Sequence, residues 1–270
     1  MGTSINLPTP AGGDWTDIKR EINSLLGNAV AKNPQKLISN VIGASGGMAF
    51  PSTKGSGGGS ASGLGGGGSG KRSGSARNAS VGNTISSLAG FATALGRSDL
   101  GAALDSLGLG ELRGRPAAEV VARIAEHIAG ISDGLQQELL SATLRDALLD
   151  AAAIEGDRSY QNLDAALQGF LAREGVEGLV QCFLTKYVFD RVWTLIENHV
   201  TLRTNSIDES IALSSAVERG CHAQVEMLID DLRAEGRFEQ VDWFAPAGQD
   251  LGNGIVSTLE FRLRNPEPPE

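Results

Sequence analysis

Apolar residues recur at helical spacing over most of the chain that follows residue 80. The first stripe comprises Val81, Ile85, Leu88, Ala89, Ala92 and Leu95. Residues three or four positions apart lie on one face of an α-helix, so such stripes indicate amphipathic helices that pack against one another. The pattern therefore predicts a helical bundle domain over residues 81–235.

The longest apolar stripe begins after Gly175 and predicts the central helix of this bundle, ending near Val200. Its members are Val176, Leu179, Val180, Phe183, Leu184, Val188, Val192, Leu195 and Ile196. Helix boundaries agree with the stripes elsewhere, because Pro116 suits the first turn of a helix and Gly130 follows its last apolar position. Periodicity and boundary residues thus indicate the same mainly α fold.

A separate helical segment is expected near the N-terminus, over residues 14–42. Asp14 is suited to cap the first helix, and Asn33-Pro34 to end it. The apolar positions between them are Trp15, Ile18, Ile22, Leu25, Leu26, Ala29 and Val30. Residues 1–13 contain two prolines and end in two glycines, so we expect an extended, mobile tail there.

The C-terminal residues 236–270 show a different period. Apolar and polar positions alternate from Ile255 to Arg264, which is typical of a β-strand, and a single strand needs a partner. The sequence favours a short hairpin with residues 241–244 across a loop at 250–254. The alternative is addition of the strand to a sheet edge of another protein. The predicted fold class is mainly α, with a short C-terminal β-hairpin after the bundle.

Glycine accounts for 36 of the 270 residues, and most of the excess over average usage lies before residue 75. Residues 43–80 form a Gly/Ser-rich stretch, in which ordering each residue costs backbone entropy without adding side-chain packing. We interpret this stretch as a flexible linker with a mean span of about 35 Å. The alternative is a glycine-rich loop that packs into a groove on a partner.

Charge divides the chain at the same place. Residues 1–80 contain eight Lys/Arg and three Asp/Glu, so the net charge of −9 arises from the acidic remainder. An acidic bundle repels a phosphate backbone, and nucleic-acid binding is therefore not expected. Four basic residues of the linker suit either contact with an anionic partner or simple solvation. They are Lys54, Lys71, Arg72 and Arg77.

Cysteine and histidine positions offer no catalytic or metal-binding pattern. Cys182 and Cys221 lie among apolar helical positions without C-x-x-C spacing, which indicates buried reduced thiols rather than a disulfide or a zinc site. Cys221 and His222 are adjacent, and neighbouring helical residues point about 100° apart, so they do not form a nucleophile–base pair. The sequence predicts no catalytic residue and no cofactor, and hence a protein that is not an enzyme.

Acidic residues in the second half of the chain raise the question of a metal site. Asp230, Asp231, Glu235 and Glu239 are typical of the solvated face of an amphipathic helix, so no metal is expected. No apolar run reaches about 18 residues, and the N-terminus lacks the basic and apolar regions of a signal peptide. We therefore expect a cytoplasmic protein without a membrane segment.

The N-terminal residues offer one candidate for chemistry. Gly2 is small enough for Met1 to be removed, which exposes an unhindered α-amino group with a pKa near 8. Myristoylation requires Ser or Thr at position 6, where this chain has Asn6, so lipidation is not expected. On residues alone, the alternative is that Gly2 simply follows a start codon.

The chain combines Gly2-Thr3-Ser4, a proline-containing stretch before Trp15, a Gly/Ser/Arg-rich middle and the segment from Ser87 to Gly130. In this organisation, which covers most of its length, the chain resembles the QatB family of the bacterial Qat anti-phage defence system. The sharpest part of the resemblance lies at Gly2-Thr3-Ser4 and at the segment from Ser87 to Gly130.

The resemblance implies a non-catalytic accessory protein that works with a QueC-like enzyme (QatC), an ATPase and a TatD-like nuclease. The QueC-like enzyme would use ATP to attach a 7-deazaguanine group to the processed N-terminal glycine, here Gly2. Thr3 and Ser4 would contact that enzyme. The alternative function is that of a secreted or injected helical effector, or its carrier, in which a flexible tether links a delivery segment to the bundle.

Overall fold

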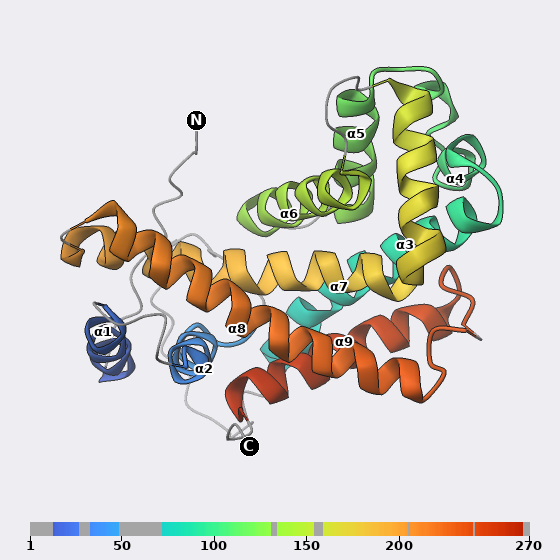
Figure 1. Ribbon diagram of the computed structural model, residues 1–270. Coiled ribbons are helices and arrows are strands. Elements are labelled where there is room, and N and C mark those ends of the chain that lie inside the picture. The colour runs from blue at the N-terminus through green and yellow to red at the C-terminus, as the bar shows by residue number, and fades with distance from the viewer. Residues whose placement is uncertain are drawn as a thin grey trace, which may run out of the picture.

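The computed structural model describes residues 13–26, 33–48, 72–130, 134–153, 159–204, 206–239 and 241–266. Over these ranges every regular element is a helix and no strand occurs (Figure 1). The elements are α1 (Gly13–Leu25), α2 (Gln35–Ala44), α3 (Arg72–Arg97), α4 (Leu100–Ser106), the short 3-10 helix η1 (Gly110–Leu112), α5 (Ala117–Ala129), α6 (Gly134–Ala152), α7 (Tyr160–Arg203), α8 (Ile207–Ala234) and α9 (Pro246–Arg264). The prediction of a mainly α fold is confirmed.

The boundaries of several helices follow from local sequence. All six members of the stripe predicted after residue 80 are buried in α3. Gly130 ends α5 with a φ of 67°, and Pro116 precedes its first turn as the N-cap. Asp99, Ser159 and Ser206 cap α4, α7 and α8, each accepting a hydrogen bond from a backbone N–H of the first turn. The capping residues therefore determine where these helices begin or end, and the apolar stripes determine which face is buried.

Helix α7 is the central helix, as predicted, because it packs against α1, α2, α3, α5, α6 and α8. It begins earlier than expected, at Tyr160, and bends at Gly175, where φ is 71° and ψ is −175°. The arm before Gly175 stands across the arm that follows it (Figure 1). Only glycine adopts this left-handed conformation without strain, so the bend is encoded by this one residue.

The described helices share one cluster of buried apolar side chains. The cluster includes Ile18 and Ile22 of α1, Leu37 of α2 and Leu259 of α9. Helix α2 packs against α7, α8 and α9, and α9 packs along α3 (Figure 1). The N-terminal helices are therefore part of the same core as the bundle.

The predicted C-terminal strand is wrong, because the residues assigned to it form helix α9. Residues 241–244 form an irregular turn, so neither a hairpin nor a strand for another protein's sheet is present. Ile255, Val256, Leu259 and Leu263 lie on one face of α9 and are buried. Two glycines of α9, of which only Gly252 falls in the predicted loop at 250–254, allow close approach to other parts of the backbone. These are Gly248, against the backbone of Trp243, and Gly252, against the backbone of Gly82.

The predicted linker and tail fall mostly outside the described residues. Helix α3 begins at Arg72, so the backbone of residues 72–80 is helical, whereas the composition predicts a linker there. Residues 43–48 complete α2 and the turn after it. Residues 1–12 and 49–71 lie outside the described residues.

Candidate functional site

The residues predicted as the site, Gly2, Thr3 and Ser4, lie outside the described residues, which begin at Gly13. Helix α1 is the described element next to them in sequence. One face of α1 is firmly held, since Trp15 retains 7% of its exposure while Ile18 and Ile22 are fully buried. Asp14 and Asp17 of the same helix are exposed. Burial of Trp15, Ile18 and Ile22 thus holds the start of α1 against the core.

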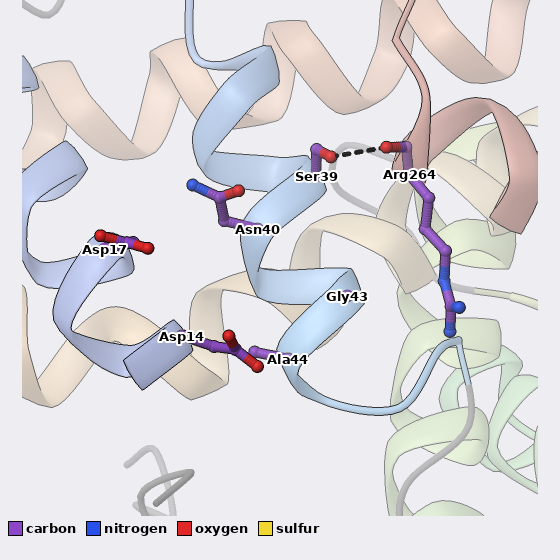
Figure 2. Close-up of a pocket in the computed structure, with 7 residues that line it drawn as sticks. All are labelled: Asp14, Asp17, Ser39, Asn40, Gly43, Ala44 and Arg264. Atoms are coloured by element: carbon purple, nitrogen blue, oxygen red, sulfur yellow. Dashed lines mark hydrogen bonds between the residues drawn. The ribbon is translucent and has the colours of Figure 1, made fainter. Parts of the chain in front are cut away.

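A polar cavity of about 330 Å³ lies beside the start of α1 (Figure 2). Helix α1 contributes Asp14 and Asp17, α2 contributes Ser39 and Asn40, and Arg264 comes from the end of α9. The Ser39 hydroxyl donates a hydrogen bond to the Arg264 carbonyl oxygen at 2.8 Å, which ties α2 to α9. The cavity therefore sits where three helices meet.

The polar groups that line this cavity are suited to hydrogen bonds and ion pairs. Asp17 forms an ion pair with Arg20 at 3.0 Å, so part of the carboxylate charge is already compensated. A Cβ at Gly43 would meet no atom within 4 Å, which leaves this wall open. Carboxylate and amide groups on an open wall suit the amines, amides and hydroxyls of a protein partner.

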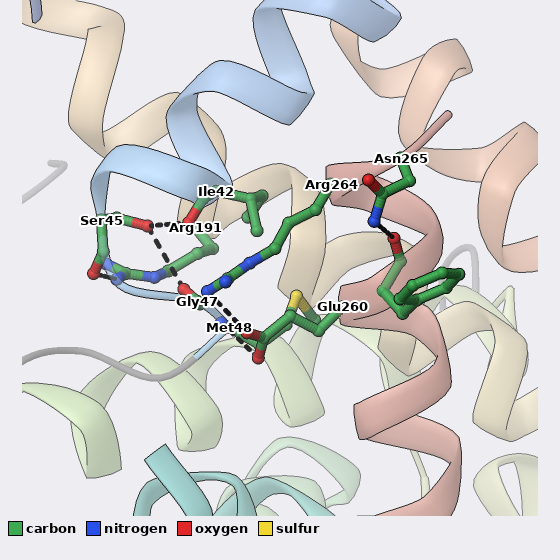
Figure 3. Close-up of polar contacts among 9 residues, drawn as sticks. Ile42, Ser45, Gly47, Met48, Arg191, Glu260, Arg264 and Asn265 are labelled. Carbon is green, nitrogen blue, oxygen red and sulfur yellow. Dashed lines mark hydrogen bonds and ion pairs between the residues drawn. The ribbon is translucent and has the colours of Figure 1, made fainter. Parts of the chain in front are cut away.

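A second polar cluster holds the turn that follows α2, from Ser45 to Met48 (Figure 3). The Tyr187 hydroxyl of α7 donates to the Met48 carbonyl oxygen at 2.6 Å. The Met48 N–H donates to Glu260 of α9 at 3.3 Å, and Glu260 also pairs with Arg264 at 2.7 Å. We call this set of contacts, together with the hydrogen bond from Arg191 of α7 to the Ser45 carbonyl oxygen, the turn clamp. It joins the chain after α2 to both α7 and α9.

Electrostatics of the turn clamp are dominated by burial. Arg191 is fully buried, and its guanidinium donates to the Ser45 carbonyl oxygen at 3.5 Å. Burial lowers the pKa of Arg191 to about 10, so the group keeps its charge at neutral pH. Burial also raises the pKa of Tyr187, which stays a protonated donor. Arg191 and Tyr187 therefore both keep their protons at neutral pH.

Sequence reasoning missed the turn clamp, although a signal was present. Tyr187 and Arg191 lie four positions apart inside the longest apolar stripe, next to Val188 and Val192. A tyrosine and an arginine on a buried helix face require polar partners. Those partners, Met48 and Ser45, are 139 and 146 residues away along the chain, so periodicity could not identify them.

Cysteine and histidine do not come together as a reactive pair. Cys221 is buried, which raises the pKa of its thiol. The His222 side chain is half exposed and faces Glu226 at 3.6 Å. Cys182 is half-buried, and burial likewise raises its pKa. Neither thiol is therefore activated as a thiolate.

The acidic residues near the end of α8 pair with arginines. Asp230 pairs with Arg233 at 2.7 Å, and Asp231 pairs with Arg262 of α9. Within the described ranges, no group of three or more His, Cys, Asp or Glu residues is arranged to hold a metal ion. None of the described helices is long and apolar enough to cross a membrane.

The fold and these sites define a helical bundle protein in which polar contacts such as Ser39–Arg264 and Tyr187–Met48 tie separate helices together. A family model for the Qat anti-phage system associated protein QatB matches residues 67–240, which is more than half of the chain. The chain therefore belongs to the QatB family and is an accessory component of a Qat anti-phage system. No curated protein and no solved structure matches it.

Proposed function

We propose that the chain is the partner and the substrate of a QueC-like enzyme, which attaches a 7-deazaguanine group to the α-amino group of Gly2. Membership of the QatB family is the observation that carries this proposal. The residues Gly2-Thr3-Ser4, on which the resemblance to that family rests, support it. Thr3 and Ser4 are the proposed contacts with the enzyme.

The proposed reaction is the acylation of an amine. ATP converts a carboxylate of the deazaguanine precursor into an activated acyl group that bears a phosphate-containing leaving group. The uncharged Gly2 amine attacks this group, a C–N bond forms, the C–O bond to the leaving group breaks, and the nitrogen loses a proton. Glycine suits this role because no side chain crowds the amine, and a pKa near 8 leaves part of it uncharged at neutral pH.

The surroundings of α1 support a contact with an enzyme near this segment. The buried face of α1 keeps the helix in place, and the exposed Asp14 and Asp17 line a polar cavity next to Gly13. A docked enzyme could use these groups as hydrogen-bond acceptors while it acts on Gly2. The polar cavity is thus a proposed part of the enzyme's contact surface.

The same proposal assigns the chain a non-catalytic role in the cytoplasm, where ATP is available to the QueC-like enzyme. The ATPase and the TatD-like nuclease of the system are the further partners proposed. Fractionation of cells that carry the whole system should recover the chain with these components in the cytoplasmic fraction. Recovery of the chain in the culture medium would contradict this placement.

Intact mass of the purified chain tests the proposed modification. The chain is produced with and without the QueC-like enzyme, and tandem mass spectrometry locates any added group. We expect loss of Met1 and addition of a 7-deazaguanine group on Gly2 only when the active enzyme is present. An unmodified N-terminus in cells that resist phage would overturn the proposal.

One test variant and one control variant accompany this experiment. Gly2→Val keeps a residue small enough for removal of Met1 but crowds the amine, so modification and phage resistance should both fall strongly. Thr16→Val, on the exposed face of α1, should leave both unchanged. Phage resistance that survives Gly2→Val would separate the modification from the function of the chain.

A further inference from the structure

A groove with a volume of about 700 Å³ runs between the C-terminal half of α8 and helix α9. Its floor is apolar, since Leu228 and Ile255 are almost completely buried while Leu232, Val241 and Leu251 are partly buried. Concave surfaces of this kind, with an aliphatic floor, are typical of sites that accept apolar side chains. The groove is distinct from the polar cavity at α1.

The rim of the groove has an acidic surplus. Asp231 and Arg262 compensate each other across the groove, and Glu235 lies 3.8 Å from Arg237. Asp250, an exposed lining residue, forms no ion pair with any described residue. The groove therefore favours an occupant with a positive charge near Asp250.

Two exposed apolar side chains extend the groove along its helices. Phe261 is 67% exposed and lies three positions after Thr258, a lining residue, on the same face of α9. Met227 is 45% exposed and lies one turn before the lining residue Asp231 on α8. Large exposed apolar side chains that continue a concave apolar floor mark a surface that another protein covers. The apolar surface is thus longer than the cavity itself.

We propose that this groove binds an amphipathic helix of a partner protein, which lays aliphatic side chains on the floor and places a Lys or Arg beside Asp250. An extended apolar surface bounded by two helices matches a helix in length and shape better than a compact ligand. Aromatic and methionine side chains such as Phe261 and Met227 are enriched in protein interfaces. The proposed docking does not depend on modification of Gly2.

Site-specific photo-crosslinking tests the occupant in cells that carry the complete Qat system. A benzophenone amino acid replaces Thr258 in the groove or, as the control, exposed Glu126 on α5. We expect Thr258 to crosslink to a segment of another Qat component that has helical apolar spacing and a Lys or Arg. Crosslinks only to a second copy of this chain or to its own residues, or yields no higher than at Glu126, would overturn the proposal.

A charge exchange with a synthetic peptide of the crosslinked segment tests the contact at Asp250. Asp250→Lys should weaken peptide binding at least tenfold, and Lys→Glu in the peptide should restore it. Phe261→Ser should also weaken binding, whereas Glu126→Lys should not. Both groove residues are exposed, so thermal unfolding should confirm that these variants stay folded. Equal affinity of Asp250→Lys and the unaltered chain would contradict the predicted salt bridge and the proposal.

Discussion

Gly252 determines how closely α9 approaches α3. A Cβ at this position would overlap the carbonyl oxygen of Gly82, and a backbone atom cannot move aside cheaply. We expect Gly252→Ala to lower the free energy of unfolding by about 1–3 kcal/mol, as overpacking does in other cores. Urea denaturation measures this change.

Gly254 provides the matched control on the same helix. A Cβ there would meet no atom within 4 Å, and alanine is the better helix former by about 1 kcal/mol. Gly254→Ala should therefore leave stability unchanged or raise it. If both substitutions had the same effect, helix propensity rather than the contact with Gly82 would explain the result.

Tyr187 links α7 to the turn after α2 through a single buried hydroxyl. Tyr187→Phe removes the hydroxyl that donates to the Met48 carbonyl oxygen, so that buried oxygen loses this hydrogen bond. The expected loss is about 1–2 kcal/mol in the free energy of unfolding. Tyr160, the other tyrosine of the chain, is the control, since Tyr160→Phe removes no hydrogen bond of the turn clamp. Equal losses for both variants would argue against the turn clamp.

At the scale of elements, the packing of α1 on α7 should depend on pH. His199 of α7 contacts Trp15 of α1 edge to face, with ring centroids 6.4 Å apart. Burial lowers the pKa of His199, and the nearby cations Lys19 and Arg203 lower it further. The unfolded chain therefore takes up a proton at higher pH than the folded chain does. The free energy of unfolding should fall as the pH drops below about 6.5.

Denaturation curves from about pH 7 to about pH 5 measure this dependence. His199→Gln removes the titrating group and should flatten the curve, whereas His127→Gln, on an exposed face of α5, is the control. A curve that keeps its full slope after His199→Gln would show that other groups cause the loss of stability.

The elements also show how far the sequence could predict this fold. Long stripes, such as that of α3, were sufficient, because many residues repeat one period. In α9 the key positions Ile255, Leu259 and Leu263 are four apart, and that spacing lies on one face in both a helix and a strand. Val256, which is buried, and Phe261, which is exposed, distinguish the two, but burial is visible only in the folded chain.

The candidate sites were less predictable than the elements. The turn clamp and the groove each join residues from distant parts of the sequence, and Gly82 and Gly252 meet only after α3 and α9 have packed. A single sequence carries the periodicity of each helix but not the pairing between helices. The Gly2 prediction rests on resemblance, and it remains a prediction.

At the scale of the whole molecule, the core is larger than the region that the family model matches. That region, 67–240, omits α1, α2 and α9, yet buried residues of all three belong to the common core. A chain reduced to residues 67–240 would expose the apolar faces of α3 and α8 that α9 and α2 cover. We expect it to aggregate or to lose cooperative unfolding.

Circular dichroism and size-exclusion chromatography test this expectation. A chain that lacks only residues 1–12 is the control, since α1 begins at Gly13, and it should unfold as cooperatively as the full chain. A stable, monomeric 67–240 fragment would show that the outer helices contribute little to the core.

The fixed position of α1 has a consequence for the shape of any enzyme that acts on Gly2. Eleven peptide bonds join Gly2 to Gly13, and a fully extended chain of eleven residue steps reaches at most about 38 Å. That length limits how far the Gly2 amine can reach from the start of α1. The active site of an enzyme that modifies Gly2 can therefore lie no further than this distance from the start of α1. Each residue removed before Gly13 should shorten the reach of the Gly2 amine by about 3.5 Å. Stepwise deletion within residues 5–12 would then show the shortest segment that still allows modification of Gly2, and that length gives the depth of the enzyme's active site.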